Sequence, residues 1–279
     1  TEAFPFTYKY GIFNKKDKKF LRYEEGNNRL LLSPETNNTI NIIHDGFANL
    51  QNINWKGAGV AIPVFSLRSK KGLGTGEITD LKLLVDWARE TGLSMIQLLP
   101  INDTTATYTW RDSYPYAAIS AFALHPLLIN LDAVAGKDGA SIIKQLAKKK
   151  KVLNNLSEID YEQVLKIKLD TLKELYRQQK DSFKNDSSFF SFFELNRHWL
   201  EPYAAFCYLR DKYKTADFSK WKQYVNYDES AIQQLISSQQ NHHDEIAFFY
   251  FVQYHLHQQL KDATEYAHKH AVIIKGDIP

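Results

Sequence analysis

A short stretch near residue 110 combines the side-chain types that a sugar-binding site needs. Three aromatic residues, a guanidinium and a carboxylate fall within seven positions, in the order Trp110, Arg111, Asp112, Ser113, Tyr114, Pro115 and Tyr116. Flat aromatic faces bury the apolar side of a pyranose ring, while Arg and Asp hydrogen-bond its hydroxyls in fixed directions. The stretch therefore predicts sugar contacts from Trp110, Arg111 and Asp112, although an Arg–Asp pair at the base of a loop can also serve only to fix the loop.

Two apolar runs and a helix between them are expected to position this stretch. Residues 58–65 and 94–100 are mostly apolar without alternation, which predicts strands buried on both faces. Between them, Thr79 or Asp80 can cap a helix that Gly92 ends in a left-handed turn. The inner stripe of this helix is Leu81, Leu84, Val85 and Ala88. Strand, helix and strand of this length predict a right-handed βαβ unit with a parallel sheet.

The loops that follow the two strands, residues 66–77 and 101–120, are where such folds carry their chemistry. The first loop holds three glycines within residues 72–76, which invites comparison with a nucleotide-binding loop. However, Glu77 stands where the third glycine of the dinucleotide fingerprint would be, and no Gly-Lys-Ser/Thr follows. We therefore predict a tight loop over the barrel mouth and no nucleotide site.

Composition excludes several classes of protein. The net charge of +3 comes from 35 basic and 32 acidic residues, so nothing indicates a nucleic-acid partner. The single cysteine, Cys207, excludes an internal disulfide and favours a reducing, cytoplasmic location. No apolar run approaches the length of a membrane span, and no signal-peptide pattern opens the chain. Histidines pair at 242/243, 255/257 and 268/270, without the four-residue spacing that aims two imidazoles at one metal ion, so we predict no metal site.

The first part of the chain predicts a small antiparallel sheet. Aromatic residues occupy every second position from Phe4 to Tyr10, which is the period of a half-buried strand. A polar turn precedes a second strand at residues 20–23, and a turn at residues 25–28 leads into a third strand at residues 29–32. Residues 34–55 then predict a linker with a short extended piece.

Beyond the aromatic stretch, residues 136–267 follow helical periodicity almost throughout. Asp160 can cap one of these helices, and Pro202 is expected to break the chain between two others. Because residue 1 is Thr and the chain stops at Pro279, just after an apolar strand that a parallel sheet would bury, we expect a fragment of a longer polypeptide.

Several motifs, in order, resemble one enzyme family. Residues 62–68, 72–77, 97–104, 112–116 and 120–123 together resemble the amylomaltases, the 4-α-glucanotransferases of glycoside hydrolase family 77. The similarity covers nearly the whole chain. It is greatest to the longer branch of the family, whose members carry starch-binding modules ahead of the barrel.

The start of the chain is similar to the closing strands of a family 20 starch-binding module. There a Tyr-Lys-Tyr strand leads to a Trp-Glu-x-Gly-x-Asn-Arg signature, which residues 8–10 and 23–29 match only approximately. Tyr23 stands in place of the tryptophan. A tyrosine can stack on glucose, or it can be a core residue of an incomplete sandwich, and both interpretations stay open.

The resemblance implies an α/β fold: the first three strands of a (β/α)8 TIM barrel with a long helical insertion, preceded by antiparallel strands of a β-sandwich starch-binding module. The implied domains are the end of that module at residues 1–45, a linker at residues 46–57, and the first part of the catalytic barrel at residues 58–279. The helical insertion occupies about residues 136–267 of the barrel.

The implied activity is transfer of α-1,4-glucan segments between maltooligosaccharides through a covalent glucosyl-enzyme intermediate, without cofactor or metal. Retaining transfer needs two carboxyl groups about 5 to 5.5 Å apart. Asp277 is a candidate by position, since it ends a strand. The resemblance instead implies that Asp277 shapes the donor subsite and that the catalytic acids lie beyond Pro279, so this chain alone is expected to be inactive.

The resemblance also implies roles for residues of the aromatic stretch. Tyr116 matches the family's tyrosine platform beside the scissile sugar, whereas an extra residue, Tyr114, separates Ser113 from the following proline and leaves the role of Ser113 open. Asn102 and Asp103 are weaker candidates. The partners implied are α-1,4-glucans and maltooligosaccharides; a non-catalytic glucan-binding protein and an α-glucan hydrolase remain alternative functions. The preferred glucan and the oligomeric state do not follow from the sequence.

Overall fold

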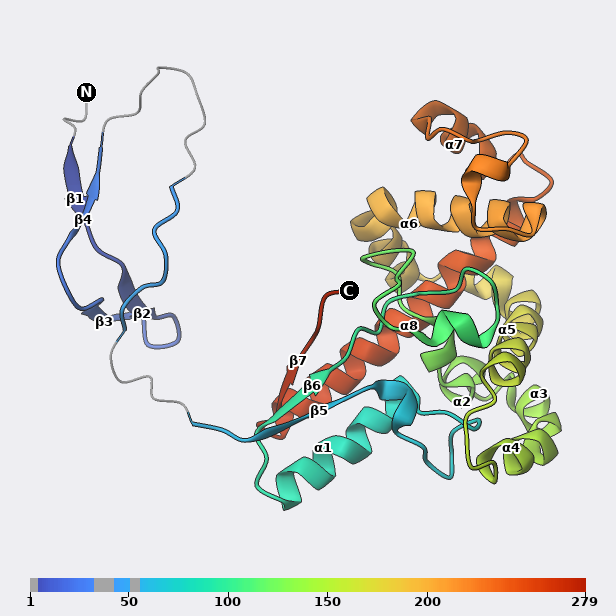
Figure 1. The fold of residues 1–279 in the computed structure, drawn as a ribbon, viewed down its shortest axis with the longest axis horizontal. Coiled ribbons are helices and arrows are strands. Elements are labelled where there is room, and N and C mark those ends of the chain that lie inside the picture. The colour runs from blue at the N-terminus through green and yellow to red at the C-terminus, as the bar shows by residue number, and fades with distance from the viewer. Residues whose placement is uncertain (1–4, 33–42, 51–55) are drawn as a thin grey trace. The chain divides into compact units, whose positions relative to one another are not determined.

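The computed structural model describes residues 5–32, 43–50 and 56–279, and the chain divides into two compact units, residues 1–56 and 57–279 (Figure 1). Phe4 and, within the linker predicted at residues 34–55, residues 34–42 and 51–55 lie outside the described residues.

The smaller unit contains two antiparallel strand pairs. β1 (Phe6–Tyr8) pairs with β4 (Arg29–Leu31), and β2 (Gly11–Asn14) pairs with β3 (Lys19–Tyr23). The strands predicted near residues 20 and 29 are confirmed, but the sequence analysis missed β2. A Cβ at Gly11, the first residue of β2, would lie 2.6 Å from the exposed Phe20 ring, so a side chain there would require this ring to shift.

The larger unit is organised on a parallel sheet in the order β5-β6-β7, formed by β5 (Gly59–Ile62), β6 (Met95–Leu98) and β7 (Ile273–Lys275). Helix α1 (Leu81–Glu90) connects β5 to β6, which confirms the predicted βαβ unit. Gly92 adopts φ +77° after α1, as the predicted left-handed turn requires.

Two details of this unit differ from expectation. β5 is not buried on both faces: Val60 and Ile62 are partly buried, whereas Gly59 and Ala61 are exposed. In β5, Gly and Ala alternate with branched residues, so hydropathy alone does not distinguish the two faces of the strand. The face that carries Gly and Ala stays exposed because these residues offer little apolar area to bury. The Asp80 side chain does not cap α1 but accepts the backbone N–H of Glu77 at 2.9 Å, closing a short 3-10 turn before the helix.

The chain between β6 and β7 is mainly helical. The elements are α2 (Leu131–Ala135), α3 (Ala140–Gln145), α4 (Ala147–Asn154), α5 (Tyr161–Lys184), α6 (Ser187–Tyr213), α7 (Glu229–Ile236) and α8 (His243–Lys269), with short 3-10 turns η3 (Trp110–Ser113), η4 (Pro126–Leu128) and η5 (Phe218–Lys220). Two further 3-10 turns, η1 (Val64–Ser66) and η2 (Ile78–Asp80), lie earlier, between β5 and α1. Helix α8 packs against α1, α5, α6 and β7, so it joins the sheet to the other helices (Figure 1). The Asp160 side chain accepts the N–H of Gln163 at 3.0 Å, which confirms the predicted cap.

The break predicted at Pro202 is wrong, because α6 continues through this residue from Ser187 to Tyr213. A proline removes one intrahelical hydrogen bond. Burial of its neighbours offsets that loss: Leu200, Ala204 and Ala205 are fully buried, in the helix pair that α6 forms with α8.

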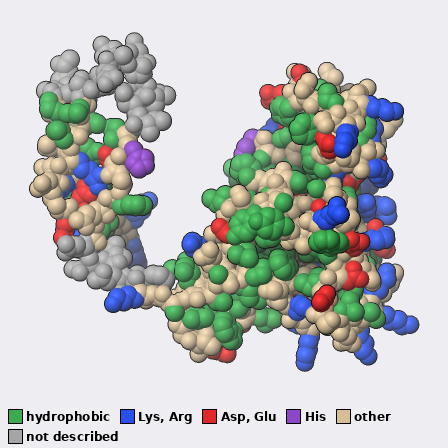
Figure 2. Space-filling model, viewed as in Figure 1, with side chains coloured by type: hydrophobic (Ala, Val, Ile, Leu, Met, Phe, Trp, Pro, Cys, Tyr) green, Lys and Arg blue, Asp and Glu red, His purple; other side chains and the backbone are tan. Residues whose placement is uncertain are grey.

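Charged side chains cover the outer helices. Figure 2 shows Lys and Arg gathered along the edge of the larger unit where α4 and α5 lie. Within the run Lys148–Lys151, Lys148 and Lys149 are exposed and form no ion pair with a described residue, as expected for a solvated helix. Among the described helices, none is both long enough and apolar enough to cross a membrane.

Candidate functional site

Loops at the carboxyl ends of β5 and β6 form the candidate site. The aromatic stretch lies in the second of these loops, where η3 holds its first four residues. Backbone hydrogen bonds close the loop on itself: the Asp103 N–H donates to the Ala123 carbonyl, and the Ile119 N–H donates to the Asp103 carbonyl, each at 2.8 Å. The aromatic side chains therefore stand on a folded loop.

Asp112 holds this loop from inside. Its carboxylate accepts backbone N–H groups of Ala106 at 3.1 Å, Thr107 at 2.8 Å and Tyr108 at 2.6 Å. It also accepts the Thr107 hydroxyl at 2.9 Å, and the Asp112 side chain is buried. Because both carboxylate oxygens already accept hydrogen bonds, the structure gives Asp112 a loop-fixing role.

Helix α6 supports the same loop from the side. The buried Tyr203 hydroxyl donates to the Asp103 carboxylate at 2.6 Å, and burial raises the pKa of Tyr203 well above its ordinary value. The Arg210 guanidinium donates to the Thr105 carbonyl at 2.6 Å and lies over the Tyr108 ring at 4.6 Å. These contacts join residues about 100 positions apart and leave the Asp103 carboxylate inside the protein.

Tyr116 and Asp277 meet at the exposed side of the loop. The Tyr116 hydroxyl donates to the Asp277 carboxylate at 2.9 Å, across 161 positions of sequence, and this hydrogen bond is the main reason why the pKa of Tyr116 is raised. Tyr116 is 44% exposed, and the Tyr114 ring lies 5.7 Å from it, tilted by 48°. The structure thus brings together two residues that the sequence analysis selected separately.

Trp110, Arg111 and Ser113 complete the exposed side. Trp110 is 66% exposed, and its backbone N–H donates to the Glu162 carboxylate at 3.2 Å. Arg111 and Ser113 are exposed, and their side chains form no hydrogen bond or ion pair with another described residue. Their polar groups are accordingly available to a ligand.

A mainly apolar pocket of about 220 Å³ lies beside Trp110. Its lining includes Trp110, Ser113 and Pro115 from the aromatic stretch. The rest of the lining is Phe65, Pro100, Ile101, Asn102, Thr104, His125, Leu127, Leu128, Ile159 and Tyr161. The His125 ring nitrogens contact the Leu127 N–H and the Tyr161 hydroxyl at 3.0 Å, and burial lowers the pKa of His125, so the imidazole is neutral at pH 7. Such a pocket can take the apolar face of a small ring.

The glycine-containing loop after β5 is buried rather than open to a ligand. Residues 72–77 are all buried, and the Gly74 N–H donates to the Asn154 side chain at 2.7 Å. Gly74 has φ +75°, and a Cβ there would lie 2.8 Å from the Leu153 side chain. The loop therefore packs against the end of α4, and its backbone N–H groups are not arranged around a phosphate.

A buried ion pair that the sequence analysis missed lies beneath both loops. The Lys168 ammonium, fully buried on α5, donates to the Glu77 carboxylate and to the carbonyls of Leu127 and Ile129, each at 2.7 Å. The second oxygen of Glu77 accepts the Asn130 side-chain amide at 2.6 Å. The sequence did contain a signal for this ion pair, because Lys168 occupies a position in the apolar stripe of α5, where helical spacing predicts a buried side chain.

Two glutamines on α8 hold the chain that follows the aromatic stretch. Gln253 bonds both the N–H and the carbonyl of Leu124 at 2.8 Å. Gln259 bonds the N–H of Asn130 at 2.9 Å and its carbonyl at 3.0 Å. Each buried side-chain amide bonds the backbone N–H and the backbone carbonyl of one residue, as a neighbouring strand would. Helix α8 therefore fixes the end of the loop.

In the smaller unit, Tyr23 is 62% exposed and its ring lies 4.7 Å from Phe20. The Arg29 guanidinium pairs with the adjacent Glu24 carboxylate through two bonds of 2.7 Å, and this contact lowers the pKa of Glu24 to about 2. Tyr23 is thus an exposed ring next to a fixed ion pair.

Across the parts of the chain that the structure describes, no group of three or more His, Cys, Asp or Glu side chains is arranged to hold a metal ion. Cys207 is buried on α6 and is not in a disulfide.

Sequence and structure comparisons establish the family. The profile of glycoside hydrolase family 77, described as 4-alpha-glucanotransferase, matches residues 62–279, so the chain belongs to this family of enzymes of carbohydrate metabolism, as the sequence motifs predicted. Among individual relatives, the rice (Oryza sativa subsp. japonica) 4-alpha-glucanotransferase DPE2 is 42% identical over 280 residues. That match covers 99% of this chain but 29% of the rice protein.

Shorter relatives match about four-fifths of the chain. The 4-alpha-glucanotransferase of Chlamydia pneumoniae is 34% identical over 225 residues, which cover 79% of this chain and 40% of that protein. Among solved structures, the amylomaltase from Streptococcus agalactiae in complex with acarbose has a TM-score of 0.62 at 20% identity, covering 81% of this chain and 43% of that one. The larger unit therefore has part of an amylomaltase-like fold, and the chain spans less than half the length of these relatives.

Proposed function

We propose that the protein to which this chain belongs transfers α-1,4-glucan segments between maltooligosaccharides by a retaining double displacement. In this proposal β5, β6 and β7 are the first three strands of a (β/α)8 barrel, with residues 58–279 as its first part and residues 136–267 as its helical insertion. Residues 1–45 are the end of a starch-binding module, joined through a linker at residues 46–57, and Tyr23 is its sugar-stacking ring. Family membership and the exposed aromatic loop support this assignment.

The observation that carries the proposal is the hydrogen-bonded pair of Tyr116 and Asp277 beside the exposed Tyr114 ring. In parallel barrels, active-site groups gather at the carboxyl ends of strands. A ring that is held by a carboxylate can stack on one glucose unit while Asp277 accepts a hydrogen bond from its hydroxyls. Trp110, Arg111 and Ser113 add sugar contacts along the same side of the loop, and Asp112 acts by holding the loop in shape.

The catalytic carboxylates are proposed to come from residues beyond Pro279. Retaining transfer needs a free nucleophile and a general acid about 5 to 5.5 Å apart. Asp103 and Asp112 cannot take those roles because both are buried and accept hydrogen bonds within the protein. We therefore expect residues 1–279 alone to bind maltooligosaccharide weakly and to turn over none.

Product analysis tests the reaction type. The intact protein is incubated with maltotriose, and the products and the number of reducing ends are followed together. Transfer yields glucose and longer maltooligosaccharides at a constant number of reducing ends, because each broken glycosidic bond is replaced by another. A rising number of reducing ends would establish a hydrolase instead, and unchanged maltotriose would favour a non-catalytic binding protein.

Substitution of Tyr116 tests the site. We expect Tyr116→Ala to lower kcat/KM for maltotriose about tenfold or more, because it removes roughly 1–2 kcal/mol of ring stacking, and Tyr116→Phe to lower it about threefold. Tyr227→Ala is the matched control, since Tyr227 is also exposed but lies outside the loop. Equal kcat/KM in Tyr116→Ala and the control would refute the assigned role of Tyr116.

A further inference from the structure

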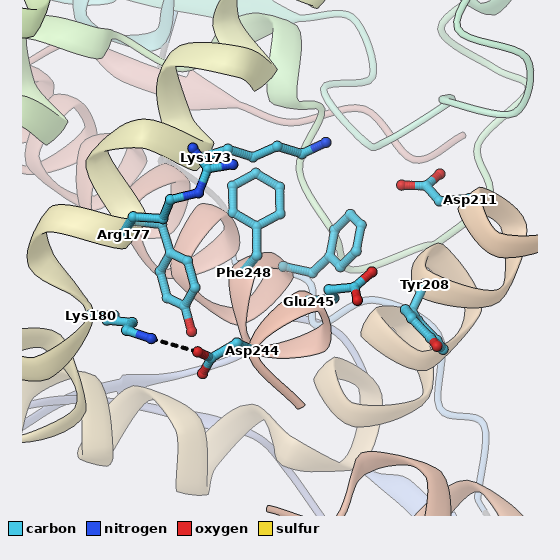
Figure 3. A pocket seen from close by; sticks show the side chains of 10 residues that line it. Lys173, Arg177, Lys180, Tyr208, Asp211, Asp244, Glu245 and Phe248 are labelled. Carbon is cyan, nitrogen blue, oxygen red and sulfur yellow. Dashed lines mark hydrogen bonds and ion pairs between the residues drawn. The ribbon is translucent and has the colours of Figure 1, made fainter. Parts of the chain in front are cut away.

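A groove on the helical part of the larger unit is lined by groups that the proposed glucan site does not use. A pocket of about 490 Å³ lies between α5, α6 and α8 (Figure 3). A second hollow of about 820 Å³ lies beside it, and Lys173, Tyr208, Asp211 and Glu245 line both. Pockets of this volume hold small organic ligands.

The charges of the smaller pocket are only partly paired. The Lys180 ammonium pairs with the Asp244 carboxylate at 2.6 Å, and Asp211 accepts the Arg210 guanidinium at 2.9 Å. Lys173 and Arg177, one turn apart on α5, have no acidic partner among the described residues. They therefore leave two cations with free donors on one wall of the pocket.

The opposite wall carries a free acceptor. Glu245 on α8 is exposed and its carboxylate accepts no hydrogen bond from a described residue, while Phe248 lies one turn further along the same helix (Figure 3). The Lys173 ammonium lies 5.9 Å from the centre of the Phe248 ring, a contact that leaves its three N–H donors available. The pocket thus has a cationic side and an acceptor side about an aromatic floor.

From these groups we infer that the groove binds a phosphorylated monosaccharide. Lys173 and Arg177 hold the phosphate, because guanidinium and ammonium groups together provide the charge and the directed donors that a phosphomonoester needs. The exposed Glu245 carboxylate accepts hydrogen bonds from the sugar hydroxyls. A neutral sugar would leave the two cations unused, and a ligand with several phosphates would be repelled by Glu245.

Isothermal titration of the intact protein at low salt tests this inference. We expect glucose 6-phosphate or glucose 1-phosphate to bind with one-to-one stoichiometry, more tightly than inorganic phosphate, and maltose not to compete. The double variant Lys173→Ala with Arg177→Ala should weaken binding more than tenfold, because it removes two charge-assisted hydrogen-bonding groups.

The matched control is Lys148→Ala with Lys149→Ala, which removes the same charge from the exposed surface of α4. It should bind as the unmodified protein does, and thermal unfolding followed by circular dichroism confirms that each variant is folded. No binding at millimolar sugar phosphate, equal loss in the control, or equal affinity for inorganic phosphate would overturn the inference. Glucan transfer is measured separately and does not enter this test, so failure here is distinguishable from failure of the proposed function.

Discussion

The polar groups beneath the aromatic loop are held differently from those on its exposed side. Beneath it, one fully buried ammonium on Lys168 makes three bonds of 2.7 Å, including the bond to Glu77. On the exposed side, the Tyr116 hydroxyl makes one bond to Asp277, and Trp110 is two-thirds exposed. Buried charges must be saturated to be tolerated, whereas groups that meet a ligand must keep capacity free. Residues whose hydrogen-bonding groups are all occupied within the protein are therefore framework residues. Residues that keep such groups unoccupied are candidate ligand contacts.

The largest loss of stability is expected from Lys168→Met. The variant leaves the Glu77 carboxylate buried without its cation, which should lower the free energy of unfolding by about 3–5 kcal/mol. Urea unfolding followed by circular dichroism measures it. The control Lys166→Met removes an exposed pair with Asp170, where a loss of about 0.5 kcal/mol or less is expected. If the two variants were equally stable, Lys168 would not be part of the framework.

Acid should also lower the stability of the larger unit through buried histidines on α8. Burial lowers the pKa of His255 and of His257 to about 4, so between about pH 6.5 and pH 4 the unfolded chain binds protons that the folded chain does not. Their contribution to stability is present above pH 6.5 and is lost as the pH falls towards 4. We expect the free energy of unfolding to drop by about 4 kcal/mol from pH 7 to pH 5 on account of the two rings.

Urea unfolding at several pH values checks this dependence. The variant His255→Leu with His257→Leu should flatten it, because neither position can then bind a proton. Replacing His198, whose ring is exposed, with Gln should leave the dependence unchanged. The same steep pH dependence in all three proteins would place its origin elsewhere.

A smaller loss of stability is expected from Asp112→Ala, about 2 kcal/mol, because three backbone N–H groups lose their acceptor. Asp112→Asn keeps one oxygen and should fall between this variant and the unmodified protein. In the intact protein both should lower glucan turnover through the shape of the loop. Wild-type stability in Asp112→Ala would show that the loop does not depend on this carboxylate.

The smallest effect on stability is expected from Tyr116→Phe, within about 0.5 kcal/mol, because the hydroxyl is exposed and makes a single hydrogen bond. Its consequence should instead appear in glucan transfer, as set out above. A loss of stability as large as that of Asp112→Ala would show that Tyr116 is a framework residue and not a candidate ligand contact.

Much of the fold was predictable because its signals are local. The apolar runs at residues 59–62 and 95–98, the cap at Asp160 and the positive φ at Gly92 follow from side-chain type over a few positions. The break assigned to Pro202 failed because that local rule omits the burial of the α6–α8 helix pair, which outweighs one lost hydrogen bond.

By itself, the sequence determined the parallel βαβ unit, the helical segment, the family and the composition of the aromatic loop, since each depends on neighbouring residues or on short motifs. Only the tertiary structure decided which of those polar groups face a ligand. It turned Asp112 inward, paired Lys168 with Glu77 across 91 positions, and brought Asp277 to Tyr116 across 161. Such pairings arise when packed helices and strands bring distant residues together, and spacing along the chain carries no record of that approach.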